Sequence, residues 1–88
     1  MCYHLFMTKK TKLYEKIKNN PENVRFEDIC NLAEMVGFVI KNVQGSHKMY
    51  RRVGVIELLN FQNDKGKAKP YQVKQLLKII EAYELELK

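Results

Sequence analysis

Apolar residues recur at helical spacing in two segments of the first half of the chain. In residues 8–20, three apolar side chains share one side of a predicted helix that lysines surround, and Pro21 disfavours its continuation. In residues 26–36, apolar side chains fall at the i, i+3, i+4, i+7 spacing of a buried stripe, and Gly37 follows as a helix stop. The pattern therefore predicts two amphipathic helices, each with one buried side.

Three runs rich in β-branched and aromatic residues follow, at residues 38–44, 47–53 and 55–62. A Gly-Ser pair supplies turn chemistry between the first two runs, and a single glycine separates the second from the third. Connections this short predict an antiparallel meander. Strict alternation puts the odd-numbered residues of the middle run on one face of the sheet and its even-numbered residues on the other.

The residue pattern in the last part of the chain predicts one more helix. Residues 63–69 are a polar, basic segment typical of a loop, and Pro70 suits the first turn of a helix that extends to about residue 84. The element order is therefore α-α-β-β-β-α. This order predicts an α+β domain with a three-stranded antiparallel sheet and helices packed on one face.

The first seven residues are apolar, but they lack the basic flank and the length of a secretory signal peptide. We interpret residues 1–7 as an extension, with Met7 as one hypothesis for the natural start. An ordered strand or a hydrophobic anchor is the alternative. Residues 8–88 are expected to form a single domain. Two cysteines without regular spacing, and no apolar run of about 20 residues, favour a reducing cytoplasm.

The chain carries a formal net charge of +6, and the excess is concentrated in one stretch. Residues 38–70 hold seven lysines and arginines against two acidic residues, whereas the flanking segments are nearly neutral. A concentrated basic stretch is typical of a protein that binds a polyanion such as RNA, although a solvated basic face is the structural alternative. The candidate RNA-binding residues are Lys41, Lys48, Tyr50, Arg51, Arg52, Lys65, Lys67 and Lys69.

His47 is the candidate for proton transfer. Histidine ordinarily has a pKa of about 6.5, so its ring both accepts and donates a proton near neutrality. His47 follows the Gly45-Ser46 turn and lies within the basic stretch. Phosphodiester cleavage needs such a group, together with cations that stabilise developing negative charge, and RNA supplies the 2′-hydroxyl as its own nucleophile. The alternative is that His47 is an ordinary polar residue at a turn.

A functional site could also contain residues that stack on a base or bind a metal. Tyr50 precedes two arginines and is the best candidate to stack on a base, with core packing as the alternative. Cys2, His4, Cys30 and His47 show no recognised zinc spacing. We therefore expect neither a metal nor a cofactor.

Residues 45–51, Gly-Ser-His-Lys-Met-Tyr-Arg, resemble the G-S-H-x-x-[YF]-R core of HicA toxins. Two other stretches agree with this resemblance. Val-Arg-Phe at residues 24–26 leads into an amphipathic helix that ends in Gly-Phe, and residues 66–73 resemble the segment that leads into the last helix of the family. Together the similar stretches span roughly residues 8–84 in the order of the family.

The resemblance implies a fold similar to double-stranded-RNA-binding domains and ribonuclease activity on messenger RNA. It also implies a cognate HicB-type antitoxin that covers the active surface. By this resemblance His47 is the catalytic residue, and Gly45 and Ser46 shape its turn.

The sequence departs from the family at two positions. Lys48 stands where many relatives have a second histidine, and the loop before the last helix lacks a histidine that some relatives carry there. The second proton, or charge stabilisation alone, would then come from Lys48, Tyr50 or Lys41. Two non-catalytic functions also stay open: an RNA-binding module of the same fold, and an interaction subunit whose basic face binds only an acidic protein.

Overall fold

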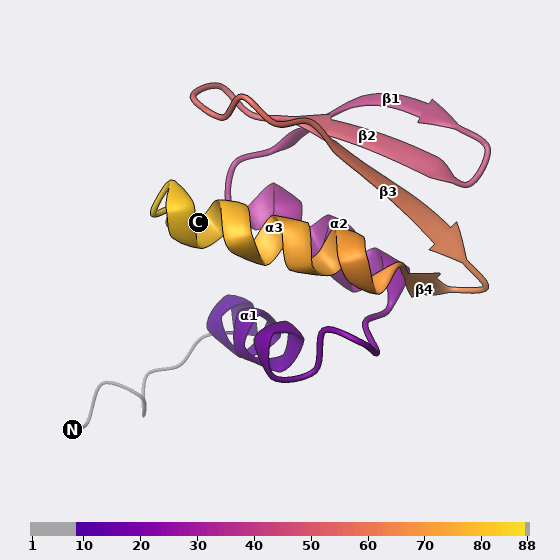
Figure 1. Cartoon of the computed structure of the whole chain (residues 1–88), viewed down its shortest axis with the longest axis horizontal. Coiled ribbons are helices and arrows are strands. Elements are labelled where there is room, and N and C mark those ends of the chain that lie inside the picture. Colours follow the sequence, from indigo (N-terminus) through magenta and orange to yellow (C-terminus); the bar gives the residue numbers. More distant parts are fainter. Residues whose placement is uncertain (1–8, 88) are drawn as a thin grey trace.

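The computed structural model describes residues 9–87, which form one antiparallel sheet and three helices on one side of it (Figure 1). In Figure 1, α2 and α3 lie against the sheet and α1 lies on their far side. The elements are α1 (Lys9–Asn19), α2 (Phe26–Met35), β1 (Val39–Gln44), β2 (His47–Arg51), β3 (Leu59–Asp64), β4 (Lys67–Ala68) and α3 (Pro70–Ala82). The predicted α+β class and the helices on one face are confirmed.

The described sheet has four strands in the order β1-β2-β3-β4, so the prediction of three strands is wrong. The segment 63–69, predicted as a loop, contains a hairpin. β3 reaches Asp64, the chain turns through Lys65 and Gly66, and β4 pairs back onto β3. Lys65 and Gly66 have positive φ angles of 54° and 87°, as both central residues of a type I′ hairpin turn require.

The connection between β2 and β3 also differs from the prediction. β2 ends at Arg51 instead of residue 53, and β3 begins at Leu59 instead of residue 55. Arg52, the first residue after β2, directs its side chain toward the end of α2. Its Nε donates a hydrogen bond to the Val36 carbonyl (2.7 Å), and its Nη1 donates one to the Val53 carbonyl (2.8 Å). These bonds hold the start of the connection against the end of α2, and the chain returns to the sheet at β3.

The hydrophobic core lies between α2, α3 and the sheet face that they cover. The predicted stripe of α2 is fully buried in it, and α1 adds Ile17 from the far side. Burying a large apolar side chain stabilises a fold by about 1.5–3 kcal/mol, so these contacts hold the sheet onto the helices. The largest fully buried side chains are Tyr50, Phe38, Phe61, Ile17, Ile29, Leu32, Leu59, Leu76, Val36 and Val73.

α2 ends in a hydrogen-bonding pattern that requires a glycine. The Phe38 amide donates to the Ala33 carbonyl (3.0 Å) and the Gly37 amide donates to the Glu34 carbonyl (3.1 Å), which together form a Schellman motif. Gly37 has a φ of 98°, and a Cβ at this position would lie 2.8 Å from Arg52 Nε. Both the backbone angle and the arginine therefore select glycine here.

α3 ends in the same motif without a glycine. The Leu85 amide donates to the Ile80 carbonyl (3.0 Å) and the Glu84 amide donates to the Glu81 carbonyl (3.2 Å). Glu84 takes the left-handed position with a φ of 52°, where a residue with a Cβ is strained.

No helix within residues 9–87 is long and apolar enough to cross a bilayer. The predicted extension at residues 1–7 lies outside the described residues.

Gly37→Ala should lower the free energy of unfolding by about 2–4 kcal/mol, measured by chemical denaturation. Left-handed alanine costs roughly 1–2 kcal/mol, and displacing Arg52 from the end of α2 removes a charged hydrogen bond of similar magnitude. Gly45→Ala is the matched control, because Gly45 also has a positive φ (59°) but no atom lies within 4 Å of the added Cβ. Equal losses in the two variants would contradict a specific role for Arg52.

Glu84→Gly should raise the free energy of unfolding by about 0.5–1 kcal/mol, since glycine adopts the left-handed angle without strain. Thermal unfolding measures the change. Glu86→Gly is the control: Glu86 is exposed and has no positive φ, so that variant should gain nothing. A similar gain in both variants would point to a general effect of charge removal.

Candidate functional site

The two sides of β2 face different surroundings. Tyr50 is only 1% exposed, whereas His47 and Arg51 are exposed on the side that α2 and α3 do not cover. Successive side chains of a strand point to opposite faces, so His47, Met49 and Arg51 lie together on the uncovered side. We call this side, opposite the helices, the open face of the sheet.

The Gly45-Ser46 turn places His47 at the very start of β2. Gln44 pairs directly with His47, so the connection is a two-residue loop. Gly45 has a φ of 59° and Ser46 has no positive φ, a combination that a type II′ turn requires. The Ser46 carbonyl accepts a hydrogen bond from the Asn63 amide of β3 (2.8 Å), which ties the turn to the sheet. The expected role of these two residues in shaping the turn therefore has a local geometric basis.

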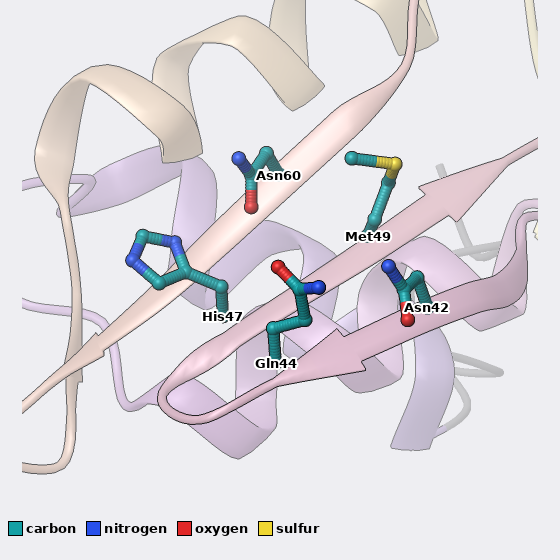
Figure 2. Close-up of a pocket in the computed structure, with 5 residues that line it drawn as sticks. All are labelled: Asn42, Gln44, His47, Met49 and Asn60. Carbon is teal, nitrogen blue, oxygen red and sulfur yellow. The ribbon is translucent and has the colours of Figure 1, made fainter.

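His47 lies at the edge of a shallow hollow on the open face (Figure 2). The hollow has a volume of about 260 Å³ and is lined by Asn42, Gln44, His47, Met49 and Asn60. These residues come from three adjacent strands, because Met49 pairs with Asn42 on one side and with Asn60 on the other. In Figure 2 all five side chains project from the same face of the sheet.

The hollow contains one titratable side chain. Within the described part of the chain the His47 ring makes no hydrogen bond or ion pair, so both of its nitrogens can contact a ligand. Its neighbours supply three amides, which donate and accept hydrogen bonds without titrating, and a thioether. The arrangement offers one group for proton transfer and several neutral groups that can hold a polar polymer.

Tyr50 does not belong to this site, which corrects its selection as a base-stacking or RNA-binding residue. Its ring packs against Phe61, with 5.7 Å between centroids, and its hydroxyl donates to Glu34 Oε2 at 3.3 Å. Burial, together with neighbouring Cys30 and Glu34, raises the pKa of the Tyr50 phenol well above its usual range. The side chain is a protonated core residue that neither stacks on a base nor transfers a proton to substrate.

Lys48 and Arg52 are also directed away from the open face. Lys48 is partly buried, and its ammonium lies 5.7 Å from the centre of the Phe26 ring on the side of the helices. Two nitrogens of Arg52 donate hydrogen bonds to backbone carbonyls, one at the end of α2 and one in the loop after β2. These two cations therefore have structural partners, which the sequence did not indicate.

The remaining basic candidates fall into two groups. Lys41, Arg51 and Lys65 are exposed and make no ion pair within the described residues. Lys41 lies in a bulge of β1, where the pairing register with β2 shifts. By contrast, Lys67 donates to Asn23 Oδ1 (2.6 Å) and Lys69 pairs with Asp64 (3.3 Å). Only Arg51 shares the open face with His47 by strand alternation.

Sequence reasoning missed the neutral residues of the hollow. Asn42, Gln44 and Asn60 were not selected, and Met49 was assigned only to the same face as His47. The available signal was the presence of asparagine and glutamine within the predicted strands. Polar side chains of a strand usually face solvent, so these residues could have been placed on the exposed face of the sheet. Their proximity to His47 nevertheless depends on the pairing register, which the sequence did not fix.

Among residues 9–87, no three histidines, cysteines, aspartates or glutamates are grouped so that they could hold a metal ion. Cys30, one of the residues tested for zinc spacing, is a buried free thiol. Comparisons with protein-family models, with curated proteins and with solved structures found no match.

Proposed function

We propose that this chain is an endoribonuclease toxin of the HicA type, which cuts messenger RNA with His47 as its proton-transfer residue. One observation carries the proposal: the single titratable side chain of the hollow is exposed, unengaged and surrounded by hydrogen-bonding amides. The resemblance of residues 45–51 to the HicA core selects the same histidine. Its position at the start of a hairpin strand leaves its side chain exposed on the open face.

In the proposed reaction, His47 takes the proton of an RNA 2′-hydroxyl. The 2′-oxygen then attacks the adjacent phosphorus, and the bond from phosphorus to the 5′-oxygen breaks. The products are a 2′,3′-cyclic phosphate and a 5′-hydroxyl. Asn42, Gln44 and Asn60 can donate hydrogen bonds to the RNA and hold it in position.

The proton for the leaving 5′-oxygen must come from a second side chain or from solvent. Of the three candidates for a second group, Tyr50 is buried and Lys48 lies on the side of the helices. Lys41 is exposed on β1 and is the one candidate still available for charge stabilisation. We therefore assign the 5′-oxygen a proton from solvent, and His47 returns to solvent the proton that it took from the 2′-hydroxyl.

The proposal includes the remaining expectations of the family. An antiparallel sheet with helices on one face is compatible with a fold like that of double-stranded-RNA-binding domains. A HicB-type antitoxin is the proposed partner, bound over the open face and shielding His47. The cytoplasm, where messenger RNA is translated, is the proposed location.

A non-catalytic RNA-binding module is the second candidate. It is favoured by one observation: the hollow holds no second acid or base beside His47. A binding module would retain labelled RNA intact after long incubation, and its affinity would fall with salt by a log-log slope of about 0.7 per phosphate contacted on single strands.

His47→Ala should reduce the rate of RNA cleavage by about 10²–10⁴-fold, because removing a general acid or base typically has an effect of this size. A gel of end-labelled RNA measures the rate. His47 is exposed and makes no contacts through its ring, so the melting temperature should stay close to that of the parent.

Lys12→Gln is the control, since Lys12 is an exposed residue of α1, on the side of α2 and α3 away from the sheet. It removes one positive charge without touching the hollow. Cleavage by His47→Ala at the parent's rate would show that the catalytic residue has been assigned incorrectly.

The fragments should carry a 2′,3′-cyclic phosphate and a 5′-hydroxyl, and cleavage should continue in excess chelator. Mass spectrometry of a short cleaved oligonucleotide identifies both ends. Loss of cleavage in chelator, or fragments with a 5′-phosphate, would instead indicate a metal-activated water as the nucleophile.

A further inference from the structure

The open face continues along β2 from His47, past Met49, to Arg51, which lines a second hollow where the sheet meets the end of α2. This hollow has a volume of about 510 Å³ and is lined by Gly37, Val39, Arg51, Arg52 and Val53. Arg51 follows His47 by four positions on one strand, which separates their backbones by about 13 Å. The two hollows therefore lie at opposite ends of β2.

The chemistry of the second hollow suits an anion. Its charged lining residues are two arginines, and no acidic side chain lines it. Arg52 is fixed by its two hydrogen bonds to backbone carbonyls, whereas Arg51 has no hydrogen bond or ion pair within residues 9–87. A guanidinium without a partner can bind a phosphate through two parallel hydrogen bonds. Val39 and Val53, 63% and 93% exposed, add apolar contact area.

The part of the first hollow that leads from His47 towards Arg51 suits nucleotide bases. Asn42, Met49 and Asn60 line it, so a chain that leaves His47 in this direction meets two amides and one apolar side chain. Unstacked bases expose the edges that such amides recognise, and only single strands present them freely. Strand alternation directs the Asp64 carboxylate to the same face, but at the far end of β3, where it pairs with Lys69.

We propose that the hollow at Arg51 is a second phosphate-binding subsite for single-stranded RNA. The strand cut at His47 runs along β2, and Arg51 binds a phosphate a few nucleotides from the cleaved bond. A stacked strand advances about 3.4 Å per nucleotide, so about 13 Å corresponds to at most about four nucleotides. This inference rests on the proposed function for the position of the cut and adds to it a direction and a length for the substrate.

The test combines Arg51→Gln with substrates of graded length. Each substrate is a 2′-O-methyl RNA with one unmodified nucleotide, which confines cleavage to one bond, and carries one to six nucleotides on either side of it. Arg51→Gln should lower kcat/KM by about tenfold once one flank reaches the subsite, and should leave shorter substrates unaffected. The loss should appear mainly in KM and for extension on one side only. Lys12→Gln, with the same change of charge on α1, should show no dependence on length.

A second arm measures binding without cleavage. Fully 2′-O-methylated oligonucleotides lack the nucleophile, and fluorescence anisotropy reports their affinity for the parent and for Arg51→Gln. We expect the variant to bind twelve-nucleotide RNA about tenfold more weakly and three-nucleotide RNA equally well. Equal weakening at all lengths would mean general attraction of charge, and no weakening would mean that Arg51 does not contact RNA; either result overturns the subsite.

The two arms separate failure of the subsite from failure of the proposed function. If cleavage depends on His47 but neither arm shows an effect of Arg51→Gln, the proposed nuclease activity is supported and the subsite is contradicted. If RNA stays intact while Arg51→Gln shows the length-dependent loss of binding, the proposed nuclease activity is contradicted. The subsite is then supported as part of an RNA-binding surface. A protein that binds no RNA overturns both.

Discussion

The burial of Tyr50 fixes which face of the sheet exposes His47. Its ring packs against Phe61 of the next strand, and its hydroxyl reaches Glu34 on α2. Side chains of a strand alternate with a period of two, so anchoring this one residue inside the core directs His47 and Arg51 outward. A slip of one residue would exchange the two faces and bury the histidine. The exposed histidine is thus a consequence of the core packing of another residue of the same strand, β2.

The fold also redistributes the positive charge of the central stretch. Lys48 lies over an aromatic ring, Arg52 closes the end of α2, and Lys69 neutralises Asp64. Because these cations already have partners within the protein, fewer basic residues are available to a ligand than the sequence contains. The charge that stays available on the open face is concentrated in Arg51 at one end of β2, with His47 at the other. Under the proposed function, an RNA strand on this face follows the line from His47 to Arg51.

The site is shallow, neutral apart from one imidazole, and open along its length. A small-molecule site usually encloses most of its ligand in a concave pocket, which this sheet surface does not provide. A polymer is better suited, because it gains binding from many weak contacts along the face. RNA has the further advantage of carrying its own nucleophile, so the protein needs only to orient the backbone and move one proton. The proposed function and the surface are consistent in this respect.

The sequence by itself determined the features that depend on near neighbours in the chain. The three helices, the glycine stop after α2, and the hairpin turn that places His47 at the start of β2 follow from local spacing and turn chemistry. Tertiary structure decided the rest: the β3–β4 hairpin, the burial of Tyr50, the use of Arg52 at the end of α2, and the meeting of Asn42, Met49 and Asn60. These features arise from contacts between residues far apart in the chain, whose register is set by the packing of the whole core and not by any single segment.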